Sequence, residues 1–216
     1  MDIGWHVARA ADLPDHGDWL TDHERAVLGA LRFPKRRADW CLGRWAAKQV
    51  LGSVEYEIRA AEDGAPEAWR EGSLVPRSLS ISHAGGLGLA AVASSGPPIG
   101  CDVEVMDPRS ERFVDDYFTV DEVAWVRAQP DHTLAANLIW SAKESVLKAM
   151  REGLRLDTRR VAVTVPPTTR VGWSELSASV DGVPGLWGWW RATDRVVLTV
   201  AGLARSTELL GLVRRP

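Results

Sequence analysis

The segment IGCDVE, residues 99–104, places two carboxylates inside a run that otherwise has the composition of a buried strand. Successive side chains of a strand point to opposite faces, so Asp102 and Glu104 share one face. Like charges on one half-buried face repel each other, so a positive group should lie between them or one of them should be neutral. This strand therefore constrains what can fold against it.

The composition is that of an ordinary globular protein, with 45 % hydrophobic and 25 % charged residues among 216. This length permits one large domain or two domains of about 100 residues each. The net charge of −3 argues against a general nucleic-acid binder, which usually has a strongly basic domain. The two cysteines, Cys41 and Cys101, are too few for a disulfide framework and are expected to be buried thiols.

No run of residues approaches the ~18 apolar residues of a membrane span. The N-terminal residues are acidic and polar where a signal peptide needs a basic start and an apolar run. We therefore expect a soluble, cytoplasmic protein that binds neither membranes nor nucleic acid.

Capping and turn signals predict both helices and strands. Thr21 with Glu24, and Thr119 with Glu122, have the spacing of a capping box at a helix start. The short strands and turns between residues 79 and 105 are interpreted as an antiparallel meander. The expected elements are a strand over 3–10, helices over about 22–32, 34–51, 120–129 and 133–151, a loop-rich stretch over 53–78, strands over 79–82, 87–93 and 99–105, and four strands after residue 158. This pattern predicts an α+β protein of two subdomains that meet near residue 105.

The helix expected over 34–51 is basic on one side. Arg37, Arg44 and Lys48 lie at positions i, i+7 and i+11, so these cations fall along one helix face. Such a face is either a solvated surface or an anion-binding ridge, since arginine and lysine are the usual partners of phosphate. The spacing alone leaves both interpretations open.

A third carboxylate extends the acidic pair of the strand. Glu144, on the helix expected over 133–151, can join Asp102 and Glu104 to give the oxygen ligands that Mg²⁺ prefers. Lys148 lies one helical turn from Glu144; such a pair is either an ordinary surface ion pair or, beside a metal, part of a pyrophosphate site. The apolar stripe expected to bury this helix consists of Ala135, Ile139, Ala142, Val146 and Ala149.

Ser82 and His83 end the strand that the meander would place beside the Asp102 strand. Both can donate hydrogen bonds to a phosphate, and a purely structural role is the alternative for the histidine. The chain has no GxxxxGK phosphate loop and no GxGxxG segment between a strand and a helix. These residues together predict Mg²⁺-dependent transfer of a phosphoryl-containing group from a nucleotide-like donor.

These motifs, in this order, resemble those of the 4′-phosphopantetheinyl transferases of the Sfp type. The specific part of the resemblance is the pairing of IGCDVE with the downstream segment IWSAKESVLKAMREGLRLD, residues 139–157. SISHAGG at 80–86, FTVDE at 118–122 and the basic helix at 32–51 are also similar to the family. Together they cover much of residues 31–160.

The resemblance implies a pseudo-twofold α+β monomer of two similar subdomains, residues 1–105 and 106–216, each a small antiparallel sheet packed with helices. Coenzyme A and Mg²⁺ would bind in the cleft between them. The implied reaction transfers 4′-phosphopantetheine from coenzyme A to a serine of an apo acyl or peptidyl carrier protein and releases adenosine 3′,5′-bisphosphate. The alternatives are a catalytically silent relative that binds coenzyme A or a carrier protein, and an Mg²⁺-dependent phosphodiesterase.

The resemblance also assigns roles residue by residue. Asp102, Glu104 and Glu144 would bind Mg²⁺. Glu144 is expected to be the catalytic base for the serine, and Lys148 the catalytic group that stabilises the leaving phosphate or shares in proton transfer. The coenzyme A phosphates would be bound by Lys35, Arg37, Arg44, Ser82, His83 and Lys148. One departure is Ala65, where the family often has a basic residue within a GKP turn.

Overall fold

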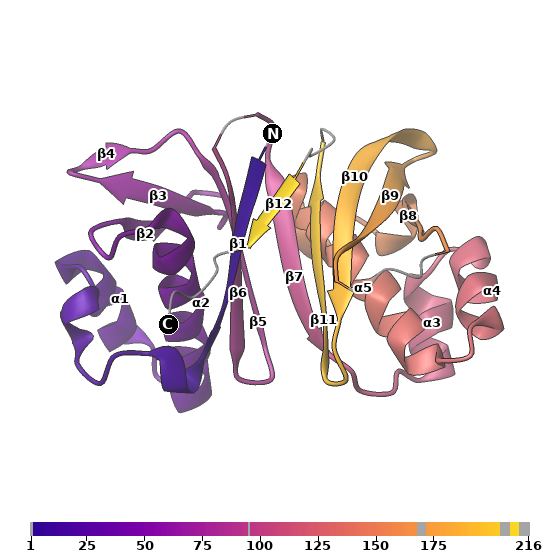
Figure 1. Cartoon of the computed structure of the whole chain (residues 1–216), viewed down its shortest axis with the longest axis horizontal. Helices are drawn as coiled ribbons and strands as arrows, with labels where there is room; N and C mark the ends of the chain where they lie inside the picture. Colours follow the sequence, from indigo (N-terminus) through magenta and orange to yellow (C-terminus); the bar gives the residue numbers. More distant parts are fainter. Residues whose placement is uncertain (1, 95, 168–171, 204–207, 212–216) are drawn as a thin grey trace. The chain divides into compact units, whose positions relative to one another are not determined.

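The structure of the chain is a computed structural model that describes residues 2–94, 96–167, 172–203 and 208–211. The chain divides into two compact units, Met1–Gly96 with Thr207–Pro216, and Pro97–Ser206. In each unit a long helix packs on a mainly antiparallel sheet (Figure 1). The predicted α+β class is therefore confirmed. No helix in the described ranges is long and apolar enough to cross a membrane.

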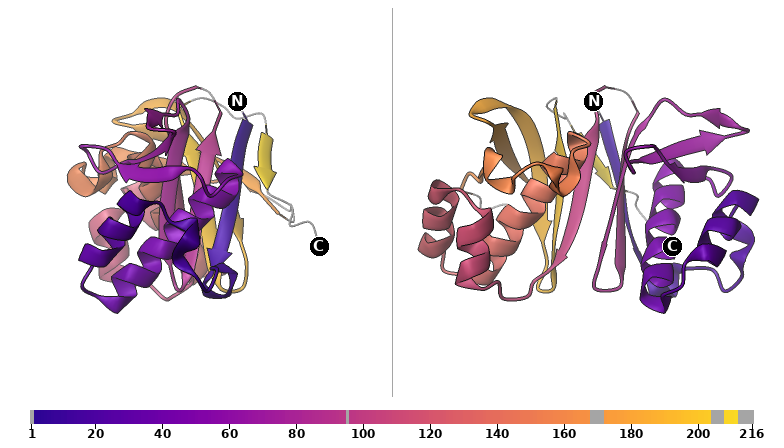
Figure 2. Two further views of the ribbon diagram at one scale, coloured as in Figure 1. Left: turned by 90° about the vertical axis from the view of Figure 1, so that its left-hand side faces the viewer. Right: turned by 180° about the vertical axis from the view of Figure 1, so that it is seen from behind.

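The first unit is built on the sheet β12-β1-β6-β5. β6 (Leu87–Ala93) pairs antiparallel with β1 (Asp2–Arg9) and with β5 (Ser78–Ala84), while β12 (Glu208–Gly211) is parallel to β1. The long helix α2 (Pro34–Leu51) packs on β6, β1 and β5, and Figure 2 shows α1 on the same side of this sheet. The remaining elements of this unit are η1 (Ala10–Asp12), η2 (Gly17–Trp19), α1 (Asp22–Ala30), and a second sheet of β2 (Glu57–Ala60), β3 (Pro66–Arg70) and β4 (Ser73–Leu74).

Local sequence signals account for the helix ends of this unit. The Thr21 hydroxyl accepts a hydrogen bond from the Glu24 amide, and the Glu24 carboxylate accepts one from the Thr21 amide, which confirms the predicted capping box. Pro34 lies in the first turn of α2, where its missing N–H costs nothing. Gly52 ends α2 with φ of 84°, a left-handed conformation that glycine adopts without steric cost.

The second unit is built on the antiparallel sheet β7-β11-β10-β9-β8. The long helix α5 (His132–Ala149) packs on β7 (Ile99–Val105) and β11 (Val196–Gly202). Figure 1 shows α3 (Glu111–Tyr117), α4 (Val120–Ala128) and α5 on the same side of this sheet. The remaining elements are η3 (Gly153–Arg155), η4 (Thr158–Arg160), β8 (Val161–Thr164), β9 (Ser174–Val180) and β10 (Val183–Ala192).

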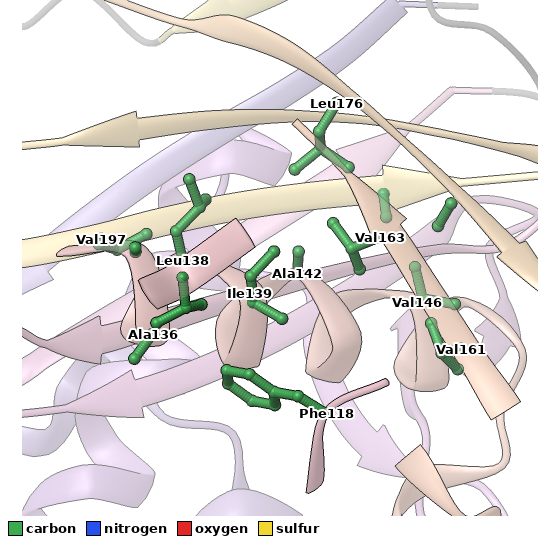
Figure 3. Close-up of a cluster of buried hydrophobic side chains, with 14 of the residues drawn as sticks. Phe118, Ala136, Leu138, Ile139, Ala142, Val146, Val161, Val163, Leu176 and Val197 are labelled. Atoms are coloured by element: carbon green, nitrogen blue, oxygen red, sulfur yellow. The ribbon is translucent and has the colours of Figure 1, made fainter. Parts of the chain in front are cut away.

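An apolar cluster fills the space between α5 and the sheet of the second unit. Figure 3 shows Ile139, Ala142 and Val146 of α5 within this cluster, together with Val163 of β8 and Phe118. The positions predicted as the apolar stripe of this helix, Ala135, Ile139, Ala142, Val146 and Ala149, are all buried. Burial of this stripe fixes the rotation of α5 about its own axis, and therefore the direction in which its polar residues project.

Both units bury a lysine–glutamate pair in the same local setting. Glu24, in the first turn of α1, accepts hydrogen bonds from Lys48 of α2 at 2.8 Å and from a backbone amide of β2. Glu122, in the first turn of α4, accepts from Lys143 of α5 at 2.8 Å and from a backbone amide of β8. Each lysine also donates to two backbone carbonyls. The two units therefore share a buried motif although the sequence shows no direct repeat.

The strand β7 lies where the meander does not place it. Its hydrogen-bonded neighbour is β11, with Asp102 opposite Thr199, and it is not in the sheet that contains β5 and β6. The predicted meander is therefore wrong for its third strand. Pro97 and Pro98 precede β7, and proline cannot donate the backbone hydrogen bonds that would continue a hairpin from β6.

Two further differences concern the limits of structural elements. The division between the units falls after Gly96 and not at the predicted residue 105, because β7 belongs to the sheet of the second unit. Residues 53–78, expected to be rich in loops, contain the three short strands of the second sheet. Their brief length and turn-rich surroundings hide the alternation by which strands are recognised.

Candidate active site

Strand β7 presents two carboxylates on the face that α5 covers. Gly100, Asp102 and Glu104 alternate with Cys101 and Val103 along the strand, so the first three share one face. Asp102 is only 4 % exposed and Glu104 is partly buried. The structure therefore places the two predicted acids together on a face that is largely shielded from water.

Gly100 allows α5 to approach β7 at backbone distance. A Cβ atom at this position would overlap the Ser145 carbonyl oxygen and lie 2.6 Å from the Ala149 amide nitrogen and 2.9 Å from the Lys148 Cβ. Only glycine leaves the space that this contact needs. The close approach brings the polar residues of α5 within reach of the β7 carboxylates.

A buried hydroxyl cluster fixes α5 along β11. The Thr199 hydroxyl lies 2.9 Å from the Ser141 hydroxyl and 2.7 Å from the Ser145 hydroxyl, and it donates to the Ser141 carbonyl at 2.8 Å. Each of the three side chains is fully buried. Because Thr199 lies opposite Asp102 in the sheet, this cluster fixes the position of α5 along the strands relative to Asp102.

Lys148 forms an ion pair with Asp102. Its Nζ lies 2.8 Å from Asp102 Oδ1 and also donates to the Cys101 carbonyl at 3.1 Å. Burial alone would lower the pKa of Lys148, but the Asp102 carboxylate, Cys101 and Glu144 together outweigh this effect, and the pKa lies above its ordinary value. Lys148 is therefore a retained positive charge at the acidic face of β7.

Glu104 is held by two donors. The Trp140 indole Nε1 donates to Glu104 Oε1 at 2.9 Å, and Arg109 Nη2 donates to Oε2 at 2.8 Å. Burial raises the pKa of Glu104, and the neighbouring Asp102 charge raises it further, whereas Arg109 and Trp140 oppose this rise. Neither donor is among the site residues predicted from the sequence.

Glu144 is the third acid of the group. Burial raises its pKa; Lys148 opposes the rise, and the charges of Asp102 and Glu104 add to it. Its Oε1 is buried and has no hydrogen-bond partner among the described residues. The three acids therefore interact electrostatically, and one buried carboxylate oxygen is left for a further ligand.

The donor set fits Mg²⁺ in its chemistry. Asp102, Glu104 and Glu144 offer only carboxylate oxygens, the ligands that this hard cation takes, and the buried Glu144 oxygen lacks a partner within the described chain. Within the ranges that the structure describes, no three His, Cys, Asp or Glu side chains are gathered closely enough to form a ready-made metal site. Asp102 and Glu104 therefore share a face of β7, and Glu144 lies on the helix that covers this face, but the three do not form a closed coordination shell.

The first unit has a pocket of about 430 Å³ near the start of α2. It is lined by Phe33, Lys35, Arg36, Asp39 and His83. Asp39 Oδ2 lies 3.4 Å from Lys35 Nζ and 3.8 Å from His83 Nδ1. Three of the five lining side chains, Lys35, Arg36 and His83, are basic, which gives this pocket the composition of an anion-binding site.

The other predicted phosphate contacts lie in different surroundings. Arg37 donates to the Leu28 and Leu31 carbonyls at the end of α1. Arg44 stacks on the Trp40 ring at 4.2 Å, and burial lowers its pKa to about 10.

The other predicted anion-binding residues differ in how far they are exposed. Ser82 is buried, and it alternates in β5 with the exposed His83, so the two side chains project from opposite faces. Lys48 of the expected basic ridge is fully buried on Glu24 and is therefore no part of an exposed anion site.

Trp140, which is not among the predicted site residues, could have been found from its spacing in the sequence. Trp140, Glu144 and Lys148 follow each other at spacing i, i+4, i+8, so Trp140 lies on the same face of α5 as the two predicted site residues. Arg109 lies outside any helix or strand, and no spacing rule connects it to Glu104. Only the tertiary structure shows that contact.

Comparisons with known proteins match both units. Residues 22–93 match the family model of the 4′-phosphopantetheinyl transferase N-terminal domain, and residues 98–180 match that of the 4′-phosphopantetheinyl transferase superfamily. The first range contains Lys35 and His83, and the second contains the acids of β7 and α5 together with Lys148.

Individual relatives agree with these matches. The chain is 32 % identical over 145 residues to 4′-phosphopantetheinyl transferase AcpT of Salmonella typhi, an alignment of 65 % of this chain and 72 % of the relative. It is also 32 % identical over 84 residues to a holo-[acyl-carrier-protein] synthase of Streptococcus agalactiae serotype III, over 34 % of this chain and 71 % of that protein. A solved holo-(acyl-carrier-protein) synthase from Bacillus anthracis, in complex with CoA (3′,5′-ADP), aligns with a TM-score of 0.35 and 23 % identity, covering 42 % of this chain and 91 % of the other.

Proposed function

The chain belongs to the 4′-phosphopantetheinyl transferase superfamily, and from this premise we propose that it transfers the 4′-phosphopantetheine group of coenzyme A to a serine of an apo acyl or peptidyl carrier protein. The second product would be adenosine 3′,5′-bisphosphate. The observation that carries the proposal is the ion pair of Lys148 with Asp102 at 2.8 Å, formed one helical turn from Glu144. This arrangement puts a cation and acids where a pyrophosphate and a metal would be bound together.

We propose that Asp102, Glu104 and Glu144 hold a Mg²⁺ ion. The support is the all-oxygen donor set and the buried Glu144 oxygen that has no partner within the described residues. When bound, Mg²⁺ would neutralise charge on the pyrophosphate, which otherwise repels the attacking serine. The raised pKa values of Glu104 and Glu144 reflect the same crowding of acids that a cation would relieve.

Glu144 is our candidate for the group that accepts the serine proton, directly or through a water. A carboxylate with a raised pKa is a stronger base than an ordinary one, so its environment suits this task. Lys148, whose pKa is raised by Asp102, stays protonated and would stabilise the charge that develops on the leaving phosphate. A share of Lys148 in proton transfer is the alternative, and the raised pKa argues against it.

The first unit would bind the nucleotide part of coenzyme A. Lys35 and His83 line the pocket near the start of α2, and both can donate to a phosphate. Arg36, which is not among the residues predicted from the sequence, lines the same pocket. Arg37 and Arg44 are weaker candidates, because the first already donates to the end of α1 and the second stacks on Trp40.

Within the superfamily we assign the chain to the Sfp type. The support is that one chain carries both the N-terminal domain match and the superfamily match, along with the paired motifs of β7 and α5. We also propose a cytoplasmic location, since neither Cys41 nor Cys101 forms a disulfide, as expected in a reducing compartment.

Intact-mass spectrometry of an apo carrier protein tests the proposed function. The carrier is incubated with the full chain, coenzyme A and MgCl₂, and its mass should increase by one phosphopantetheinyl group. Lys148→Ala should lower the rate about 100-fold or more, because it removes a charge that acts on the developing phosphate. Arg127→Ala is the matched control; Arg127 is an exposed partner of Asp115 and should leave the rate unchanged.

The same assay separates the alternatives. No mass increase with a panel of fatty-acid, polyketide and peptide-synthetase carriers would overturn the proposed transfer. Retained binding of coenzyme A under those conditions would indicate a silent relative. Release of adenosine 3′,5′-bisphosphate at an equal rate without any carrier would indicate a phosphodiesterase.

A further inference from the structure

Protein donors contact both oxygens of Glu104. Trp140 Nε1 lies 2.9 Å from Oε1, and Arg109 Nη2 lies 2.8 Å from Oε2. A carboxylate can accept about four hydrogen bonds, so each oxygen keeps a lone pair for a cation. The two donors therefore hold the plane of the carboxylate without using up its capacity as a ligand.

Arg109 is itself held in place. Its Nε donates to Asn137 Oδ1 at 2.9 Å, and its Cζ lies 4.9 Å from the Phe113 ring centroid. Asn137 is fully buried, and its amide nitrogen donates to the carbonyls of Asp107 and Thr133 at 2.8 and 2.9 Å. Arg109 thus connects a buried and fully engaged side chain of α5 to the acidic face of β7.

Phe113 supports both donors of Glu104. Its ring packs edge-on against Trp140 with centroids 4.9 Å apart, and it also contacts the Arg109 guanidinium. The contacts Glu104–Arg109–Phe113–Trp140 therefore form a closed ring of neighbours. Such a ring restricts the rotation of each member more than a single hydrogen bond would.

We propose that Arg109 is a positioning residue for Glu104: held by Asn137, its guanidinium keeps the carboxylate turned toward the face of β7 that Asp102 shares. This inference rests on the proposed role of Glu104 as a metal ligand. Glutamate has several rotatable side-chain bonds, and orienting it in advance removes an entropy cost that cation binding would otherwise carry. Loss of a residue that hydrogen-bonds to a metal ligand, without touching the metal itself, commonly lowers metal affinity about 10–100-fold.

A different role for Arg109 makes the opposite prediction. If the guanidinium only balanced the charge of the acids, its removal would leave more negative charge and strengthen cation binding. If it positions Glu104, its removal weakens cation binding in spite of that added charge. Trp140→Phe separates the two roles further, because it deletes the N–H donor to Glu104, leaves the charge of the site unchanged and keeps an aromatic ring beside Phe113.

The experiment measures Mn²⁺ binding to the full-length chain by the electron paramagnetic resonance signal of the free ion. Arg109→Met and Trp140→Phe should each raise the Kd for Mn²⁺ about 10-fold or more. Arg109→Lys should recover affinity only in part, because an ammonium cannot bridge Glu104 and Asn137 as the guanidinium fork does. Arg112→Met is the control, since Arg112 is 90 % exposed, pairs only with Asp116 among the described residues, and should leave the Kd unchanged.

The outcomes distinguish this inference from the proposed function. A parent chain that binds no Mn²⁺ would overturn the proposed metal ligands and this inference together. A parent that binds Mn²⁺ while Arg109→Met binds equally or more tightly overturns the positioning role alone. Circular dichroism establishes that each variant is folded. Should Arg109→Met unfold, unchanged affinity in both Arg109→Lys and Trp140→Phe would equally overturn the inference, and weakened affinity in both would support it.

Discussion

Gly100 lies where the backbones of β7 and α5 come into contact, and the two nearest neighbouring atoms there belong to the main chain. Replacement by alanine places a methyl group on the Ser145 carbonyl, which a side-chain rotation cannot relieve. We expect Gly100→Ala to lower the free energy of unfolding by about 3 kcal/mol or more, at the upper end of overpacking effects. Urea denaturation followed by tryptophan fluorescence measures this change.

The matched control for that prediction is Gly29→Ala. Gly29 lies within α1, and nothing lies within 4 Å of a Cβ added there. The same substitution should therefore raise the free energy of unfolding by about 0.5–1 kcal/mol, because alanine is the better helix former. Equal effects of the two substitutions would contradict the close contact of α5 with β7.

Replacing Glu144 by a neutral residue should increase the free energy of unfolding by an amount that depends on pH. Its pKa is raised in the folded chain by burial and by the charges of Asp102 and Glu104, so the folded state binds more protons than the unfolded state above the ordinary glutamate pKa. Stability is then lost as the pH rises through that window. In the presence of a chelator, Glu144→Gln should be more stable than the parent at neutral pH, and the difference should shrink toward pH 5.

Urea titrations of parent and variant at several pH values test this sign. With Mg²⁺ in place of the chelator, the order should reverse if Glu144 is a metal ligand, because the variant loses a cation contact. A Glu144→Gln variant that is less stable than the parent in chelator at every pH would contradict the crowding of acids.

At the scale of elements, the buried pair of Lys143 and Glu122 joins α5 to the start of α4 and the edge of β8. Burial lowers the pKa of Lys143, while Glu122 opposes this effect. Removing one partner leaves the other charge buried without compensation, so Lys143→Met should cost about 3–5 kcal/mol. Thermal and urea unfolding measure it, with Lys35→Met as the control, since Lys35 is 92 % exposed and should change stability by no more than about 0.5 kcal/mol.

The same elements show which features could be predicted from the sequence. The capping boxes of α1 and α4 and the ends of α2 depend on residues within a few positions of each other, and all were predicted. The pairing of β7 with β11 depends on a contact distant in sequence, so local turn signals favoured the nearer β6 instead. Local pattern therefore predicts elements better than it predicts their partners.

The candidate site divides in the same way. The face shared by Asp102 and Glu104 follows from strand alternation, and that shared by Glu144 and Lys148 follows from helical spacing. The spacing of residues along a helix does not show, however, which of its side chains are buried in the folded chain. Lys48 has the spacing of a basic ridge yet is buried on Glu24, and Arg109 reaches Glu104 from a segment without regular structure.

At the scale of the whole molecule, the proposed ligands of the cation and of the nucleotide lie in different units. Asp102, Glu104 and Glu144 belong to the second unit, whereas Lys35 and His83 belong to the first. Each ligand added alone should therefore stabilise its own unit against local opening. This separation makes the two parts of the proposed site independently testable.

Hydrogen exchange followed by mass spectrometry tests that separation. A ligand that binds only the folded state adds about 2.7 kcal/mol at a concentration of 100 Kd, and amides that exchange by local opening near its contacts slow accordingly. Mg²⁺ alone should slow exchange in β7 and α5 and leave α2 and β5 unchanged. Adenosine 3′,5′-bisphosphate alone should slow exchange near the start of α2 and the end of β5, where Lys35 and His83 lie. Protection by Mg²⁺ confined to the first unit would contradict the assignment of the three acids, because none of them belongs to it.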